Sequence, residues 1–218
     1  MKQEFCRMLC CGSITTILCN QENFTLKGNL YKIYNALPGY HVIPNPAVTP
    51  TSERGRPVNG MFVAVPENFK SKFKDVSPGF WRLQAVTFES NNVKILLINS
   101  YFPVDTQNNR YDETELVETL QFVKKILQEN QYQHVLWAGD LNADFIRKSL
   151  HTRILKTFIE EINFKIAWDV FQADFTHYSE INGVSHTSII DHFLWNSDLE
   201  NNISDCGVIH HPSNLSDH

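Results

Sequence analysis

The run HVLWAGDLN, residues 134–142, decides the fold class of this chain. Its apolar first half, His134–Ala138, is typical of a short buried strand that ends at Gly139. Asp140 and Asn142 follow two positions apart, so both polar side chains lie on one face at the rim of a sheet. There a carboxylate can hold a water and an amide can hold a phosphate oxygen, although Asp and Asn after a strand are also common turn formers.

Strand and helix patterns interleave on both sides of this run. Strands are predicted at Ile14–Cys19, Met61–Val65, Trp81–Phe88, Val93–Tyr101 and Cys206–His210. Helices are predicted at Asp112–Glu129 and Arg153–Ile162, where apolar residues recur three and four positions apart. Phe175–Ile181 and Val184–Ile190 flank Asn182-Gly183, which suits a tight hairpin turn, and Pro38–Pro57 is predicted to be a long loop. This order indicates an α/β or α+β domain.

Composition narrows the class of protein further. The 218 residues are 42% hydrophobic and 20% charged, which suits one soluble globular domain, and no apolar stretch is long enough to span a membrane. The five cysteines are odd in number and contain no CxxC pair, which disfavours both a disulfide framework and a cysteine zinc site. Reduced thiols fit a nuclear or cytoplasmic location.

The charge is unevenly distributed along the chain. The formal net charge of −5 argues against a protein that grips nucleic acid by charge alone. The segment from Arg54 to Arg82, however, contains six basic residues and only two acidic ones. This segment is either a solvated face or a contact surface for an anionic partner.

Three further groups of polar residues follow or interrupt apolar runs. Glu22 follows Ile14–Cys19, where a carboxylate can hold Mg²⁺, although a single glutamate is also common on a surface loop. The run NSYFP, residues 99–103, offers an amide and a phenol at a strand end. Asp191 lies in an apolar strand and needs a partner such as histidine, while His192 points to the opposite face and is expected to be structural.

Taken together, five motifs in order resemble the series of the endonuclease/exonuclease/phosphatase superfamily, which includes apurinic/apyrimidinic endonucleases and DNase I. They are QE at 21–22, NSYFP at 99–103, GDLN at 139–142, SIIDH at 188–192 and SDH at 216–218. Within the superfamily, RGRP at 54–57, the YFP variant and HTR at 151–153 are similar to the endonuclease domains of non-LTR retrotransposons. The resemblance implies a four-layer α/β sandwich with two mainly antiparallel sheets face to face and helices outside.

The resemblance also implies roles for ten residues. They comprise metal ligands (Glu22 and Asp217), catalytic residues (Tyr101, Asp140, Asn142, Asp191 and His218) and substrate-binding positions (Asn99, Thr176 and Ser188). Asp140 is expected to orient or deprotonate the attacking water, and Tyr101 and Asn142 to contact the phosphate. His218, held by Asp191, is expected to stabilise the pentacovalent phosphate. The implied cofactor is Mg²⁺, with Mn²⁺ as a substitute.

The implied function is a Mg²⁺-dependent DNA nicking endonuclease of a retrotransposon-derived protein. The protein is expected to be a monomer that binds DNA and does not bind a membrane. The parent element is expected to encode a reverse transcriptase domain as well. The alternatives are a phosphatase of the same superfamily, acting on a phosphoinositide or another phosphoester, and an inactive remnant of the domain. A serine hydrolase and a P-loop or Rossmann protein are disfavoured because their motifs are absent from the sequence.

Two departures from the family pattern lead to further expectations. The chain is expected to be a single domain over residues 1–218 that lacks the N-terminal strand, which in relatives bears an asparagine, and lacks the C-terminal end. We therefore expect a weak or silent nuclease, because an absent strand would leave an unpaired sheet edge and a terminal His218 would be poorly held. The hairpin Tyr178–Thr187 is expected to lie beside the site and to probe the minor groove of DNA by resemblance.

Overall fold

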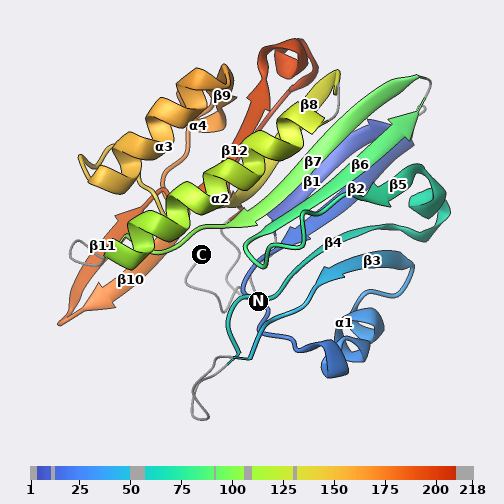
Figure 1. Ribbon diagram of the computed structural model, residues 1–218, viewed down its shortest axis with the longest axis horizontal. Coiled ribbons are helices and arrows are strands. Elements are labelled where there is room, and N and C mark those ends of the chain that lie inside the picture. The colour runs from blue at the N-terminus through green and yellow to red at the C-terminus, as the bar shows by residue number, and fades with distance from the viewer. Residues whose placement is uncertain are drawn as a thin grey trace.

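Two sheets form the centre of the molecule, and the computed structural model describes residues 4–10, 13–49, 57–90, 92–105, 110–129 and 132–209 (Figure 1). Sheet I contains four antiparallel strands in the order β1 (Glu4–Cys10), β2 (Ser13–Asn20), β4 (Met61–Pro66) and β3 (Tyr40–Asn45). Sheet II contains six strands, in the order β5 (Phe73–Asp75), β6 (Leu83–Ser90), β7 (Val93–Tyr101), β8 (His134–Asp140), β12 (Asp191–Asn196) and β9 (Phe164–Ile166). In sheet II, β7 and β8 are parallel and the other pairs are antiparallel.

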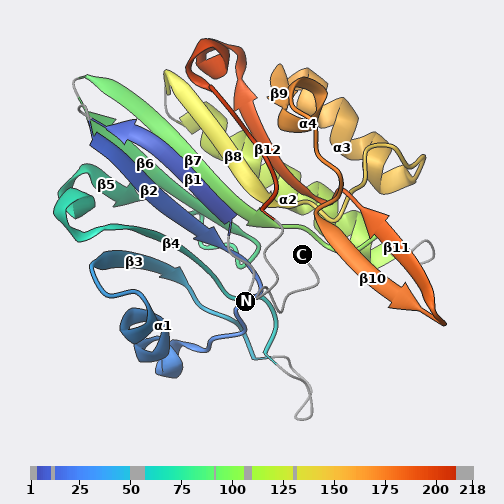
Figure 2. The same ribbon diagram turned by 180° about the vertical axis from the view of Figure 1, so that it is seen from behind.

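Helices cover the outer faces of both sheets, which gives four layers. α2 (Arg110–Glu129) and α3 (Leu150–Glu161) lie over sheet II, and the short α1 (Tyr31–Ala36) lies beside β3 of sheet I (Figure 1). The view from behind shows β1 and β2 lying over β6 and β7 (Figure 2). A short helix, α4 (Ala167–Val170), precedes the hairpin of β10 (His177–Ile181) and β11 (Val184–Ser188), which projects from the body of the molecule. The four-layer sandwich expected from the resemblance is thus confirmed.

Three apolar clusters hold these layers together. The cluster between the sheets joins residues of β2, β3 and β4 to residues of β6, β7, β8 and β12, with Ile17 and Val63 facing Leu97 and Trp195. A second cluster packs the other face of sheet II against α2 and α3, and a smaller third cluster packs sheet I against α1. Because β7 is buried on both faces, its sequence is almost continuously apolar, as the pattern predicted.

Strand register brings three site positions to one edge of sheet II. Tyr101 at the end of β7 lies opposite Asp140 at the end of the parallel strand β8. Asp191 at the start of antiparallel β12 lies opposite Asp140 from the other side. The carboxyl ends of β7 and β8 and the amino end of β12 therefore meet at the same rim, where β2 of sheet I also ends.

Two predictions about single elements were wrong, and one strand was not predicted at all. The unpredicted strand, β1, pairs along its whole length with β2 as a hairpin and contains no asparagine, so it is not the asparagine-bearing strand expected from relatives. The sequence of β1, EFCRMLC, lacks the strict alternation that would have indicated a strand. The stretch Pro38–Pro57 contains β3, an edge strand that tolerates Pro44. Cys206–Ile209 forms no strand, and His210 lies outside the described residues.

The remaining predicted elements are present with boundaries that differ by a few residues. β8 extends two residues past the predicted strand, to Asp140, and α3 begins at Leu150, three residues before the predicted start. The side chain of Ser149 caps this helix by accepting a hydrogen bond from the Thr152 backbone N–H at 3.1 Å. Within the described residues, no helix is both long and apolar enough to cross a membrane.

Candidate active site

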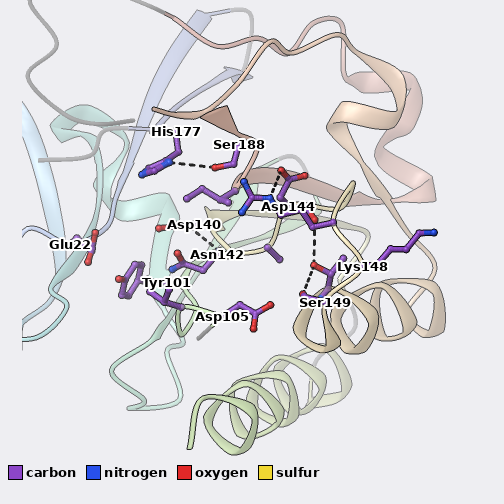
Figure 3. A pocket seen from close by; sticks show the side chains of 15 residues that line it. Glu22, Tyr101, Asp105, Asp140, Asn142, Asp144, Lys148, Ser149, His177 and Ser188 are labelled. Carbon is purple, nitrogen blue, oxygen red and sulfur yellow. Dashed lines mark hydrogen bonds and ion pairs between the residues drawn. The ribbon is translucent and has the colours of Figure 1, made fainter. Parts of the chain in front are cut away.

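A cavity of about 600 Å³ opens at the shared rim of the two sheets (Figure 3). The side chains that line it come from β7, β8 and the segments that follow them, from the loop after β2, and from the base of the β10–β11 hairpin. They are Glu22, Tyr101, Val104, Asp105, Asp140, Asn142, Ala143, Asp144, Arg147, Lys148, Ser149, Thr152, His177, Ser188 and Ile190. Five of the ten residues named from the sequence, Glu22, Tyr101, Asp140, Asn142 and Ser188, thus lie in one cavity.

Glu22 is the residue that sheet I contributes to this cavity. Its backbone adopts a left-handed conformation with φ of 52°, which is unfavourable for a glutamate and must be held by its neighbours. On one side the Gln21 amide is fully buried and donates a hydrogen bond to Asn99 Oδ1 at 2.5 Å. On the other side the Asn23 backbone N–H donates to the Gly60 carbonyl at 3.0 Å. These contacts present Glu22 to the cavity at a fixed angle.

Asn99, expected from the resemblance to be a substrate-binding residue, lies in the interior beneath the cavity. It is fully buried in β7, and its side-chain nitrogen donates to the carbonyls of Asn20 and Phe62 at 3.2 and 3.3 Å. With its oxygen accepting from Gln21, Asn99 joins sheet II to the segment before Glu22. It therefore supports the cavity from below and does not line it.

Tyr101 reaches the cavity from the end of β7 and lies beside Glu22 (Figure 3). Burial raises the pKa of its phenol above the usual value near 10, and a hydrogen bond to the Glu22 carboxylate raises this pKa further. The negative charges of Glu22 and Asp140 act in the same direction. Tyr101 is therefore a neutral hydrogen-bond donor throughout the physiological pH range.

The local structure explains why the GDLN run has glycine, aspartate and asparagine at positions 139, 140 and 142. A side chain at Gly139 would place its Cβ 2.2 Å from the Ser100 carbonyl oxygen on the neighbouring strand, so only glycine fits this position. Asp140 is 1% exposed, and its Oδ1 accepts a hydrogen bond from the Asn142 backbone N–H at 2.9 Å. The Asn142 side chain donates to the Phe102 carbonyl at 2.8 Å, which fixes its amide at the cavity wall.

Asp191 and Thr176 lie beside the cavity but are not among its lining residues. Thr176 is 6% exposed, and its hydroxyl oxygen accepts hydrogen bonds from the backbone N–H groups of Ile190 and Asp191 at 2.9 and 3.0 Å. Thr176, expected from the resemblance to bind substrate, thus fixes the backbone at the start of β12. The expected partners of this region, Asp217 and His218, lie outside the described residues.

Ser188 lines the cavity together with a histidine that the sequence analysis missed. His177 opens β10 and Ser188 closes β11, and the two residues are paired in register at the base of the hairpin. The Ser188 hydroxyl lies 3.4 Å from His177 Nδ1 (Figure 3). A signal was available, because His177 directly follows Thr176, which the resemblance had already placed among the substrate-binding positions.

A second group of residues that the sequence analysis missed lies in the segments after β7 and β8. Asp105, Asp144, Arg147 and Lys148 also line the cavity. Arg147 Nε lies 3.4 Å from the Asp144 carboxylate, and Arg147 and Lys148 are exposed at the rim. The cavity thus combines a carboxylate floor with a partly cationic rim, an arrangement that suits an anionic substrate held beside a cation.

The donor set allows one hard divalent cation with few protein ligands. Glu22, Asp105, Asp140 and Asp144 place carboxylate oxygens around the cavity, and oxygen is the donor that Mg²⁺ prefers. Among the described side chains, no three histidine, cysteine or acidic residues gather closely enough to coordinate one ion. Mg²⁺ is commonly bound through one or two carboxylates with water and substrate phosphate completing its shell, so Glu22 fits as its principal ligand.

His192 behaves as the sequence predicted. It points away from Asp191, is 1% exposed, and its Nε2–H donates to the Ala143 carbonyl at 2.8 Å. Burial lowers the pKa of the imidazole below its usual value. The neutral ring therefore supports the loop after GDLN from inside the protein.

Comparison with known proteins places this architecture among solved folds. No protein-family model matches the chain, and no curated protein matches it. An apurinic/apyrimidinic endonuclease from Leishmania major matches with a TM-score of 0.64 and 15% identity, covering 85% of this chain and 71% of that chain. The endonuclease domain of TRAS1, a telomere-specific non-LTR retrotransposon, matches with a TM-score of 0.56 and 15% identity, covering 76% of this chain and 71% of that chain.

A phosphatase shares the same architecture. A mannosyl-6-phosphatase from Bacteroides thetaiotaomicron matches with a TM-score of 0.53 and 15% identity, covering 83% of this chain and 71% of that chain. At these identities the likeness establishes a shared fold. The choice between nuclease and phosphatase must come from the cavity and its surroundings.

Proposed function

We propose that this chain, which has the DNase I-like fold of the endonuclease/exonuclease/phosphatase superfamily, is a Mg²⁺-dependent phosphodiesterase that nicks DNA. The observation that carries this proposal is the convergence of Glu22, Tyr101, Asp140 and Asn142 on one cavity, although they lie up to 120 positions apart. Their side chains supply a cation ligand, a neutral hydrogen-bond donor, a base and an amide, which together suffice for attack of water on a phosphodiester.

Each residue has a distinct task in this reaction. Glu22 would hold the Mg²⁺ ion, which would supply Lewis acidity toward a phosphate oxygen. Asp140 accepts a proton from the attacking water as the bond between phosphorus and the leaving ester oxygen breaks, and that oxygen takes a proton from solvent. The hydrogen bond from the Asn142 backbone N–H keeps the Asp140 carboxylate aligned. The Tyr101 phenol holds the Glu22 carboxylate in place, and the Asn142 amide contacts the phosphate.

DNA is the favoured substrate for two reasons. Arg147 and Lys148 stand exposed at the rim, where they can contact phosphates next to the scissile one. The β10–β11 hairpin, whose base lines the cavity, projects from the body of the molecule (Figures 1 and 2), which suits a long substrate more than a small phosphoester. A retrotransposon-derived origin rests on the RGRP, YFP and HTR runs, and is consistent with the TRAS1 likeness. We propose a monomer whose parent element also encodes a reverse transcriptase.

The direct test is plasmid nicking by the purified chain with and without Mg²⁺. Asp140→Asn is expected to lower the nicking rate by about 10²–10⁴-fold while leaving circular dichroism unchanged. Asp198→Asn, an exposed aspartate beyond the far end of β12, is the matched control and should nick like the unchanged protein. Mn²⁺ is expected to replace Mg²⁺.

The two alternatives give different results in the same experiment. A phosphatase would release inorganic phosphate from a phosphoinositide or from p-nitrophenyl phosphate faster than it nicks DNA, with the same Asp140 dependence. A folded chain that hydrolyses none of these substrates with either metal would be an inactive remnant. Nicking that survives Asp140→Asn unchanged would refute the proposed site.

A further inference from the structure

Arg82, which immediately precedes β6, lies behind the cavity in contact with Tyr101. It is 8% exposed, and its guanidinium group contacts the Glu115 carboxylate and the Tyr101 carbonyl. Nη2 donates to Glu115 Oε2 of α2 at 2.9 Å, and Nε lies 2.8 Å from Oε1 of the same carboxylate. Nη1 donates to the Tyr101 carbonyl at 3.2 Å.

Two aromatic rings complete the surroundings of this charge. The Arg82 Cζ atom lies 4.0 Å from the centroid of the Trp81 ring and 5.4 Å from the centroid of the Tyr101 ring. Both distances fall within the range of an attractive cation–π contact. The guanidinium therefore contacts the Tyr101 ring as well as its backbone carbonyl.

The backbone around Arg82 is itself fixed. Asn45 donates to the carbonyls of Phe80 and Leu83 at 3.3 Å each, and the Asn59 side chain donates to the Trp81 carbonyl. The Tyr101 backbone N–H in turn donates to the Arg82 carbonyl at 3.1 Å. Arg82 and Tyr101 thus hold each other through their main chains, and the side chain of Arg82 adds a further restraint on the ring.

We infer that Arg82 is a positioning residue for Tyr101. The Glu115 carboxylate of α2 holds the Arg82 guanidinium, and the guanidinium orients the Tyr101 ring so that its hydroxyl group reaches Glu22 in the cavity. Arg82 does not line the cavity and touches no reacting atom. A planar, permanently charged group is required here, because only arginine can bind a carboxylate through two nitrogens and contact aromatic rings at the same time. Lysine is therefore expected to replace it only in part.

The geometric part of this inference can be tested without any activity. The chain has seven tyrosines, so tyrosine labelled with ¹³C at Cζ gives a short list of signals, and Tyr101→Phe identifies the one from Tyr101. Arg82→Met and Glu115→Gln are expected to shift or broaden the Tyr101 signal, and Arg82→Lys to shift it less. The control is Glu161→Gln, which removes the exposed Lys124–Glu161 pair between α2 and α3 and should leave the Tyr101 signal in place.

The functional part rests on the proposed nuclease activity and uses a double-mutant cycle. In the protein that retains Tyr101, Arg82→Met is expected to lower kcat for nicking by about tenfold or more, because small displacements at a reacting site have large effects on rate. In the Tyr101→Phe background the same substitution is expected to change kcat by less than twofold. Equal losses in both backgrounds would mean that Arg82 acts on the fold in general and not through Tyr101.

Each failure has its own signature. If the unchanged protein nicks nothing, the proposed function fails, and the Tyr101 signal still decides the geometric inference. An unmoved Tyr101 signal in folded Arg82→Met and Glu115→Gln proteins overturns the inference whatever the activity. If Arg82→Met does not fold, Glu115→Gln and Arg82→Lys decide instead, because they leave the Arg82 position charged.

Discussion

At the scale of single residues, His192 makes the loop after GDLN sensitive to acid. Its ring is buried against Phe145 at a centroid distance of 4.4 Å, and its Nε2–H donates to Ala143. Burial lowers the pKa of the ring, and the nearby Asp191 and Asp144 only partly oppose this shift. A base with a lowered pKa stabilises the fold above the pKa of the unfolded chain, about 6.5, and this stability is lost as the pH falls.

We therefore predict that the melting temperature of the unchanged protein falls more between pH 7.5 and pH 5 than that of His192→Phe. The phenylalanine variant loses the bond to Ala143 and should be less stable at pH 7.5, but it has no charge to bury at pH 5. His186→Gln changes an exposed histidine of the hairpin and serves as the control, with the same pH dependence as the unchanged protein. An equal drop for His192→Phe would contradict the assignment.

The role of a single residue could be predicted from the sequence where it depends on the residue's place at the end of a strand, and not where it depends on partners far along the chain. Glu22, Tyr101, Asp140 and Asn142 follow strand ends, and strand ends gather at a rim, so their convergence could be expected from the motif order. Asn99 and Thr176 carry the same kinds of polar group, but their hydrogen-bond partners are Gln21, which follows β2, and Ile190, which precedes β12. These contacts are long-range, and no local pattern reveals them.

At the scale of elements, the start of β4 holds the turn that presents Glu22. Gly60 has φ of +95°, and an added Cβ would lie 2.6 Å from Asn23 Oδ1 and 3.0 Å from the Phe24 nitrogen. Gly39 has φ of +84° but nothing within 4 Å of an added Cβ. The two glycines therefore share an unfavourable conformation for alanine and differ in the clash.

We predict that Gly39→Ala lowers the free energy of unfolding by about 1–2 kcal/mol, the typical penalty for a left-handed alanine. Gly60→Ala should lower it by more and also weaken the response to Mg²⁺, because Asn23 and Phe24 must move and Glu22 moves with them. Urea denaturation with and without Mg²⁺ measures both effects. Equal behaviour of the two variants would show that the turn does not control Glu22.

A second prediction at this scale concerns the hairpin of β10 and β11. Asn182 and Gly183 have φ of 52° and 77°, the positive values that the Asn-Gly pair predicted for a tight turn. Tyr178, Ile181 and Val184 are exposed along it. These exposed side chains can contact the walls of a DNA groove and thereby respond to its shape.

We predict that replacing residues 179–186 with a short Gly-Ser turn, while keeping His177 and Ser188, changes the pattern of nicked sites on a plasmid. Dependence on Mg²⁺ should remain, because Glu22 and Asp140 are untouched. Mapping nick positions by primer extension gives the answer, and Asp198→Asn, a change beyond the far end of β12, is the control. An unchanged pattern would remove the hairpin from substrate recognition.

Elements whose sequence period matched their environment were predicted with boundaries accurate to a few residues. β7 and β8 are buried on both faces and read as apolar runs, and α2 and α3 bury one face each. β1 and β3 were missed for the opposite reason. Both are edge strands of sheet I with interrupted patterns, and pairing with a neighbouring strand compensates for the weak local preference.

At the scale of the whole molecule, metal binding should stabilise the fold, because its ligands are assembled only in the folded chain. We predict that Mg²⁺ at about 100 times its dissociation constant stabilises the protein by roughly 2.7 kcal/mol. For a chain of this size, that is a rise in melting temperature of about 5–10 °C. Glu22→Gln should abolish the rise, and Glu160→Gln, an exposed glutamate of α3, should retain it. A full rise in Glu22→Gln would place the ion elsewhere.

Glu22 follows β2 of sheet I, whereas Tyr101, Asp140 and Asn142 lie at or just after the ends of β7 and β8 of sheet II. This division between the sheets has a consequence for the lifetime of the proposed activity. Turnover requires the apolar seam between the sheets to be closed, so a molecule whose seam has opened is silent even while sheet II keeps its helices and strands. Heat inactivation should therefore precede the loss of circular dichroism on warming. Amide hydrogen exchange in β2 and β4 should track the surviving activity, while exchange in β7 and β8 should lag behind it.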